Sequence, residues 1–280
     1  MGEFATCPLE AVKAAEAICG PVELKEITDR RGSAVWKAVG AGTTVAIKAG
    51  YGDGEEITAR EAAVLDQLPD YTVTSGRHSH GVWYVTAWLD GPSTWELFKP
   101  FRQGSDLRTE ALSGAVDLCR AVADLHALGW VHSDLQPLHG VHTDMGARLL
   151  DFAWSWHTDF PQHPAFMGGI THLVAPELAV SIHDGERPAT PTQAADVYAL
   201  AGSLWTCTTG TWPLDYAAVG INPKDSTPDS LRAAIATGTV PLDPVEPWPD
   251  LQRTLRLALD ALPERRPTAS ALAGLLAALE

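Results

Sequence analysis

The sequence predicts an α+β protein in which a small β-rich half precedes a larger, mostly helical half. Between residues 22 and 50, short segments rich in Val, Ile and Thr are separated by turns that contain Gly, which is typical of an antiparallel meander. From about residue 93 onward, long segments are instead typical of helices. No internal repeat or low-complexity linker interrupts this order.

Length, composition and charge narrow the class of protein. A chain of 280 residues can bury the core of two modest domains or of one large domain. Hydrophobic residues at 45% and charged residues at 20% are typical of an ordinary globular protein. The net charge of −15 argues against nucleic acid or an anionic membrane as a partner, because both require clustered Lys and Arg. An anionic ligand therefore needs local positive charge or a bound metal.

The cysteines and the absence of targeting signals lead us to expect a cytoplasmic, bacterial protein. The four cysteines have neither a C-x-x-C pair nor a spacing typical of zinc sites, which favours free thiols in a reducing compartment. No signal peptide or long apolar run is visible. The alanine-rich composition is what we expect of a bacterial chain.

The β-rich half is predicted to begin after a helix over residues 7–19, with Pro8 in its first turn and Gly20 as its stop. Alternation and turn residues then predict four strands and one helix. These elements are strands at 22–29, 33–39, 43–50 and 81–91 and a helix at 55–68.

The second half is predicted to contain at least four long helices, at 105–129, 192–210, 251–262 and 268–279. The first of them should begin at Ser105 or Asp106 as N-cap and end at Gly129. We therefore expect three parts: a helical extension at 1–20, a small β-rich domain at 21–89 and a larger helical domain at 90–280.

Seven short motifs occur in an order and spacing that resemble the protein-kinase superfamily. They are "VAIK" at 45–48, "REAAVL" at 60–65, "HSD" at 132–134, "DFA" at 151–153, "APE" at 175–177, "DVYALAG" at 196–202 and "PERRPT" at 263–268. Each motif alone is weak, but together they cover roughly residues 22–279. The resemblance implies a two-lobed protein-kinase-like fold, with one helix C in the small lobe. The last two motifs favour bacterial, eukaryotic-like protein kinases over phosphotransferases of the aminoglycoside type.

The resemblance also implies roles for the residues that match the family's motifs. Lys48 would hold the phosphates of ATP and Glu61 would hold Lys48, although a surface ion pair is the alternative explanation. Asp151 would bind Mg²⁺. Asp134 would accept or orient the attacking hydroxyl, although an aspartate after a helix also caps turns. At the hinge, the backbone of Ala87 and Leu89 would bind adenine.

The segment "VHSDLQPLH" at 131–139, which corresponds to the catalytic loop of the family, departs from the family at three positions. Ser133 replaces an Arg, which makes activation by loop phosphorylation doubtful. Gln136 replaces a Lys but keeps a hydrogen-bond donor. His139 replaces the metal-binding Asn, and three outcomes are open: it helps to hold a metal such as Mn²⁺, it hydrogen-bonds Asp134, or the second metal is lost.

The phosphate lid and the activation segment also differ from the family. The three lid glycines align with Thr28, Arg30 and Ser33, and Gly32 is the one glycine that remains, one place early. Arg30 and Arg31 either compensate by charge or form a solvated turn.

Residues 154–174, between "DFA" and "APE", correspond to the activation segment of the family. They are rich in aromatic residues and contain no Lys or Arg, and Gly169-Ile170 stands where the family has Gly-Thr. The aromatic residues either bind an apolar acceptor or pack internally. Glu177 and Arg266 resemble a buried scaffold ion pair, and Asp196 would brace the catalytic loop.

Retention of Lys48, Glu61, Asp134 and Asp151 favours an ATP-dependent phosphotransferase that acts on a hydroxyl. We expect a specialised acceptor, either a biosynthetic peptide or a small molecule, or a protein Ser/Thr. The alternative is a pseudokinase that serves as a nucleotide-binding, scaffolding or regulatory module, since fold alone does not establish activity.

Overall fold

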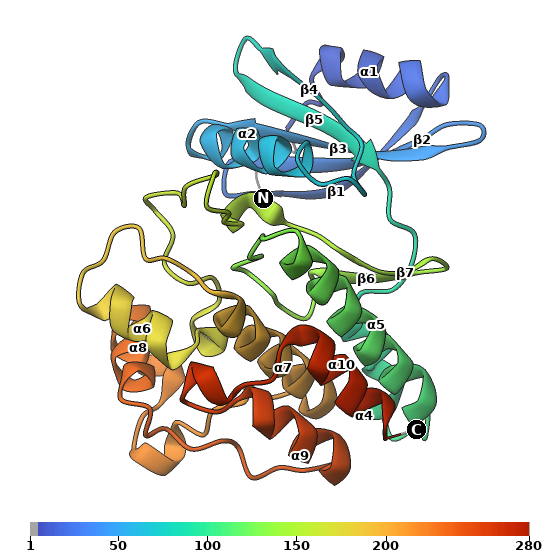
Figure 1. Ribbon diagram of the computed structural model, residues 1–280. Helices are drawn as coiled ribbons and strands as arrows, with labels where there is room; N and C mark the ends of the chain where they lie inside the picture. Colours follow the sequence, from blue (N-terminus) through green and yellow to red (C-terminus); the bar gives the residue numbers. More distant parts are fainter. Residues whose placement is uncertain (1–4, 280) are drawn as a thin grey trace. The chain divides into compact units, whose positions relative to one another are not determined.

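The computed structural model describes residues 5–279, which form two compact units with their boundary between Leu89 and Asp90. The first unit contains a five-stranded antiparallel sheet and two helices, and the second is mostly helical with a small two-stranded sheet (Figure 1). The predicted α+β class, with a β-rich part before a helical part, is confirmed.

The sheet of the first unit has the strand order β1-β2-β3-β5-β4, so its first three strands form the predicted meander. Its strands are β1 Glu23–Arg30, β2 Ser33–Val39, β3 Thr44–Tyr51, β4 Val73–His78 and β5 Gly81–Ala87. Strand β4 was not predicted, because its segment "VTSGRH" is polar and only partly buried. It pairs with β5 along its whole length at the edge of the sheet.

Alternation along β3 sends neighbouring side chains to opposite faces of the sheet. Val45, Ile47 and Ala49 are buried in one apolar core together with Ala11 and Ala15 of helix α1 (Leu9–Cys19). Lys48 lies on the other face, where it meets helix α2 (Asp53–Leu65). Helix α1 therefore docks on the sheet face opposite the one that carries Lys48.

The docking of α1 predicts a large loss of stability from a charge in its buried face. Ala15 is fully buried, so an Ala15→Glu change would place an unpaired carboxylate among apolar side chains, at an expected cost of about 3 kcal/mol or more. Thermal or urea unfolding measures this loss. The matched control is Ala17→Glu on the exposed face of the same helix, which we expect to change stability by less than about 0.5 kcal/mol. Equal effects of the two variants would contradict the docking.

The second unit is built around helix α7 (Gln193–Thr209), whose residues are buried along most of its length, including Leu204 and Trp205. This agrees with its apolar sequence on all sides. The other helices are α3 Thr94–Leu97, α4 Lys99–Arg102, α5 Arg108–Ala127, α6 Pro176–His183, α8 Pro228–Ala236, α9 Pro249–Ala258 and α10 Ala269–Ala277. Strands β6 (Gly140–Thr143) and β7 (Gly146–Leu149) form the small sheet.

Two predicted helix starts were wrong in detail. Helix α5 begins at Arg108 after Leu107, not after Ser105 or Asp106. The N–H of Ser105 instead donates to the carbonyl of Pro100, and the carboxylate of Asp106 pairs with Arg108 at 3.4 Å. In α1 the proline stands at the N-cap rather than inside the first turn.

None of the helices within residues 5–279 has the length and apolar character needed to cross a membrane. The four cysteines are free thiols, as predicted, and three of them are buried.

Candidate active site

In the first unit, Lys48 and Glu61 form a buried ion pair. The Lys48 Nζ lies 2.5 Å from Glu61 Oε2, and only 18% and 3% of the two side chains are exposed. Strand β3 presents the lysine and helix α2 presents the glutamate, thirteen residues later in the chain. A carboxylate this deeply buried needs its partner, so the surface ion pair considered above does not describe it.

The turn between β1 and β2 is a tight two-residue hairpin rather than a glycine-rich lid. Arg31 and Gly32 both have positive φ, 55° and 72°, as in a type I′ turn. The carbonyl of Gly32 accepts a hydrogen bond from the Tyr51 N–H at 2.7 Å. A Cβ at Gly32 would lie 2.6 Å from the Tyr51 carbonyl and 2.8 Å from the Gly54 nitrogen. The turn is therefore packed closely against the start of α2. Ser33 follows it, with a buried hydroxyl that has no hydrogen-bond partner among the described residues.

The predicted hinge residues lie at the end of the first unit. Ala87, the last residue of β5, pairs with Val45 of β3 and is exposed. The next residue, Trp88, donates its N–H to the Thr44 carbonyl at 3.1 Å. Leu89 is half-buried and ends the unit.

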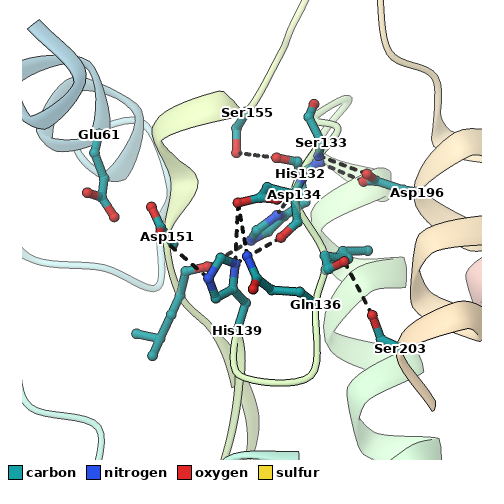
Figure 2. A network of polar contacts seen from close by, with 12 residues as sticks. Glu61, His132, Ser133, Asp134, Gln136, His139, Asp151, Ser155, Asp196 and Ser203 are labelled. Atoms are coloured by element: carbon teal, nitrogen blue, oxygen red, sulfur yellow. Dashed lines mark hydrogen bonds and ion pairs between the residues drawn. The ribbon is translucent and has the colours of Figure 1, made fainter. Parts of the chain in front are cut away.

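In the second unit, the catalytic loop is held by one buried carboxylate. Asp196 of α7 accepts the N–H of His132 at 2.6 Å and the N–H of Ser133 at 2.8 Å (Figure 2). Ser133 has a positive φ of 69°, which is uncommon for a residue with a side chain. The two bonds from Asp196 stabilise this conformation, so the bracing role expected of Asp196 matches the observed contacts.

His132 serves as a structural link in this loop. Its Nε2 lies 3.0 Å from the Leu150 carbonyl, and its Nδ1 accepts the N–H of Asp134 at 3.3 Å. Its ring packs on Phe152, with centroids 5.0 Å apart. Burial lowers its pKa, which agrees with a neutral ring that donates from Nε2 and accepts at Nδ1.

Asp134 lies in the centre of the loop with 10% of its side chain exposed. Gln136 donates from Nε2 to Asp134 Oδ2 at 3.2 Å, so it keeps the donor role expected of it. The main chain at Ile170 lies near the Asp134 carboxylate and partly offsets the rise in its pKa. Burial, and secondarily the nearby Asp151 carboxylate, raise the pKa of Asp134 to about 8. At neutral pH a carboxyl group with this pKa is mostly protonated, so it accepts a hydroxyl proton only when a positive charge beside it favours its ionised form.

His139 connects the two acidic residues of the loop region. Its Nδ1 lies 2.8 Å from the main-chain oxygen of Asp134, and its Nε2 lies 3.5 Å from Asp151 Oδ2 (Figure 2). The Asp134 carboxylate is farther, at 3.8 Å from Nδ1. The hydrogen bond to Asp134 therefore goes to its backbone. Because Nδ1 must donate to that carbonyl, the neutral ring presents the lone pair of Nε2 toward Asp151.

These three side chains fit a divalent cation. Ligand atoms of Asp134, His139 and Asp151 all lie within 4.8 Å of one another. A neutral imidazole lone pair that faces a carboxylate oxygen is unfavourable unless a proton or a metal ion lies between them. The Asp151 carboxylate and the His139 imidazole suit Mn²⁺ or a similar ion better than a purely oxygen-based pair would, and the Asp134 carboxylate lies beside them. Asp151 itself has a positive φ of 64°, and 40% of its side chain is exposed.

The activation segment packs its aromatic residues on one another. Phe166 is 1% exposed and lies 6.0 Å from the Trp154 ring, which also contacts His163 edge-on at 5.6 Å. Trp130, before the catalytic loop, packs on Phe160. These contacts explain much of the aromatic content as internal packing.

Gly169, which the sequence marked only as part of the pair that stands where the family has Gly-Thr, lies against Asp134. It has a positive φ of 66°, and a Cβ there would overlap Asp134 Oδ1. The Gly169-Ile170 pair, which departs from the expected Gly-Thr, thus brings main-chain atoms against the Asp134 carboxylate. The sequence could not show that this glycine contacts Asp134, because the two residues are 35 positions apart in the chain.

The structure therefore brings Asp134, Gln136, His139 and Asp151 together in the second unit. Lys48 and Glu61 form their own pair in the first unit, and Gly32, Ser33, Ala87 and Leu89 occupy the turn and strand end described above.

Comparison with known proteins found no family model that matches the chain. Three curated proteins are similar to it, and all three are named as serine/threonine-protein kinases. A probable LIM domain-containing kinase of Dictyostelium discoideum is 27% identical over 158 residues, 56% of this chain and 15% of that protein. The proto-oncogene kinase mos of Sus scrofa is 32% identical over 165 residues, 54% of this chain and 42% of its own length.

The third relative is the probable kinase PkwA of Thermomonospora curvata, 30% identical over 199 residues, which are 68% of this chain and 23% of that protein. The chain thus spans less than half the length of each of these relatives. The similarity, together with the order of the motifs, supports a protein-kinase-like superfamily.

Proposed function

We propose that this protein-kinase-like chain is an ATP-dependent phosphotransferase that phosphorylates a hydroxyl group. The observation that carries the proposal is the convergence of Asp134, His139 and Asp151, whose ligand atoms lie within 4.8 Å of one another. The buried Lys48–Glu61 pair supports it, because it offers one positioned ammonium group for phosphates. In this proposal residues 21–89 and 90–280 are the two lobes of the kinase-like fold, and residues 1–20 are an extension.

Each residue has a defined part in the proposed reaction. Lys48 binds the ATP phosphates and Glu61 orients it. Asp151 and His139 hold a divalent cation, Mg²⁺ or Mn²⁺, which supplies neutralisation of phosphate charge when bound. Ala87 and Leu89 offer backbone groups to adenine.

Asp134 orients the acceptor hydroxyl and takes its proton, while the acceptor oxygen bonds to the terminal phosphorus and the bond to the ADP oxygen breaks. Gln136 keeps the Asp134 side chain in place by its hydrogen bond.

The experiment that tests this proposal is calorimetric binding of ATP with Mg²⁺ and then with Mn²⁺. We expect metal-dependent binding, and we expect Lys48→Ala and Asp151→Asn each to weaken it by about tenfold or more, since each change removes a charge-assisted contact. The exposed Asp159 in the same segment supplies the matched control, Asp159→Asn, which should leave binding within about twofold.

Absence of ATP binding with either metal, in a sample with a cooperative unfolding transition, would refute the phosphotransferase proposal. Equal affinity with and without metal would refute the roles of Asp151 and His139.

A pseudokinase is the second candidate, and the β1–β2 turn favours it. The Gly32 carbonyl is engaged by Tyr51 and the turn is packed on Gly54, so this turn does not offer a run of flexible glycine amides to phosphates. Its own basic residues, Arg30 and Arg31, are exposed. ATP binding without any phosphoryl transfer to peptides, small alcohols or water would select this function.

For the acceptor we propose a specialised hydroxyl compound, either a biosynthetic peptide or a small molecule, in preference to a general protein Ser/Thr. Two departures from the family support this choice. Gly169-Ile170 stands where the family has Gly-Thr, and Gln136 stands where it has Lys. Both departures lie at Asp134 itself.

A further inference from the structure

A pocket of about 350 Å³ opens in the second unit beside the catalytic loop. Its walls come from four places in the chain: Trp95 at the start of α3, Gln136 and Leu138 of the catalytic loop, Ile170 of the activation segment, and Trp212 after α7. The volume lies in the range of pockets that bind small ligands or single large side chains.

The pocket is continuous with the proposed catalytic carboxylate through two of its own lining residues. Gln136 lines the pocket and donates to Asp134 Oδ2 at 3.2 Å. Ile170 also lines the pocket, and the main chain at Gly169-Ile170 lies against the Asp134 carboxylate. A group held in this pocket would therefore contact Gln136, which itself contacts the Asp134 carboxylate that is proposed to receive the acceptor proton.

The two tryptophan walls are held in place by other contacts. The His172 ring stacks on Trp212 with centroids 4.7 Å apart and a 21° interplanar angle, and it lies 3.2 Å from the buried Tyr216 hydroxyl. The guanidinium of Arg102 lies 3.6 Å from the centre of the Trp95 ring and also donates to the Trp95 carbonyl. A ligand would therefore enter a preformed pocket, which lowers the entropic cost of binding.

The chemistry of the lining is apolar. Two indole rings, Leu138 and Ile170 dominate it, and no residue lining it within the described chain carries a charge. Leu138 leaves 52% of its surface exposed, so much of this apolar side chain is open to a ligand. In a chain with a net charge of −15, a charge-free pocket next to the catalytic loop selects uncharged groups, since a charged group would lose its hydration there without a partner.

We infer that this pocket binds an aromatic or large aliphatic group of the acceptor, close to the hydroxyl that is phosphorylated. The inference rests on the proposed phosphotransferase function and adds the acceptor's chemical class to it. Leu138, Trp95 and Trp212 are its specificity-determining residues. The same chemistry can come from a side chain next to a serine or threonine of a peptide or from the ring of a small alcohol.

The first test measures pocket binding without ATP. Ligand-observed NMR with N-acetyl-tryptophanamide and with indole-3-ethanol should detect binding to the full chain, and N-acetyl-glutamate amide should not bind. Leu138→Glu should weaken binding of the two indole probes by about tenfold or more, because it places a carboxylate against the apolar group. Leu128→Glu is the matched control: Leu128 is 48% exposed, lies outside the pocket lining, and its change should alter binding by less than about twofold.

The second test uses a serine-centred peptide library with radiolabelled ATP, and indole-3-ethanol as the small-molecule acceptor. Enrichment of Trp, Phe, Tyr or Leu at a fixed distance from the serine supports a peptide source, and transfer to indole-3-ethanol supports a small-molecule source. Enrichment of charged residues overturns the inference.

Failure of both indole probes to bind, or equal binding by wild type and Leu138→Glu, overturns the inference even when ATP binds. Loss of ATP binding with intact probe binding would instead count against the phosphotransferase function and leave the pocket's apolar chemistry supported. The two failures are thus distinguishable.

Discussion

Replacement of Asp134 by asparagine is expected to reduce phosphoryl transfer by about 10²- to 10⁴-fold, the range typical of a lost general base. The substitution keeps the shape of the side chain, and the amide oxygen can still accept the hydrogen bond from Gln136 Nε2. ATP affinity should stay within about threefold, because Asp134 is assigned to the hydroxyl rather than to the phosphates. Radiolabel transfer to the serine-centred library measures the rate, and calorimetry measures the affinity.

The control for this variant is Asp144→Asn in the exposed turn between β6 and β7. The same chemical change there should leave transfer within about twofold of wild type. A rate for Asp134→Asn above a tenth of wild type would show that another group accepts the proton. A parallel loss of ATP affinity would instead assign Asp134 to the cation.

The second large effect is expected on stability, at Arg266. Its side chain is fully buried and forms two 2.7 Å hydrogen bonds to the carboxylate of Glu177. It also donates to the main-chain carbonyls of Ala194 at 2.9 Å and of Asp260 at 2.8 Å. Arg266→Met would leave these acceptors without their donor, at an expected cost of about 3–5 kcal/mol in the free energy of unfolding. Urea unfolding followed by circular dichroism measures it.

Two further variants identify the cause of that loss. Arg253→Met breaks a 2.8 Å pair with Asp250 in which both side chains are exposed, so it should cost no more than about 1 kcal/mol. Glu177→Gln keeps the arginine and its bonds to the main chain, and should cost less than half of the Arg266→Met loss. A similar loss in all three variants would contradict a special role for the buried arginine.

The fold could be predicted from sequence because each half carries a clear pattern of its own. The β-branched segments around Lys48 and the largely apolar segment around Leu200 were correctly assigned to a strand and a helix. Strand β4 was missed because a half-exposed edge strand carries polar residues without apolar alternation. The start of α5 was misplaced because the helix begins after Leu107 with no side-chain cap, and the Asp106 carboxylate pairs with Arg108 instead.

The site was predictable only where chemistry is carried by side chains at characteristic spacings. Motif order singled out Asp134, His139 and Asp151, which the structure places together. The main-chain contact of Ile170 with Asp134 has no side-chain signature, so sequence reasoning did not find it. The pocket walls Trp95 and Trp212 lie more than a hundred residues apart in the chain, and only the tertiary fold brings them to the same loop.

The two-faced packing of β3 also protects the sheet against misalignment. A slip of this strand by one residue would exchange the faces of all its side chains. The ammonium group of Lys48 would then enter the alanine-rich contact with α1, and Ile47 would face the carboxylate of Glu61. Both exchanges are costly, since one buries an unpaired cation and the other leaves an anion without its partner. Helix α1, which packs on the sheet face opposite Lys48, thus helps to fix the register of the strand that carries this lysine.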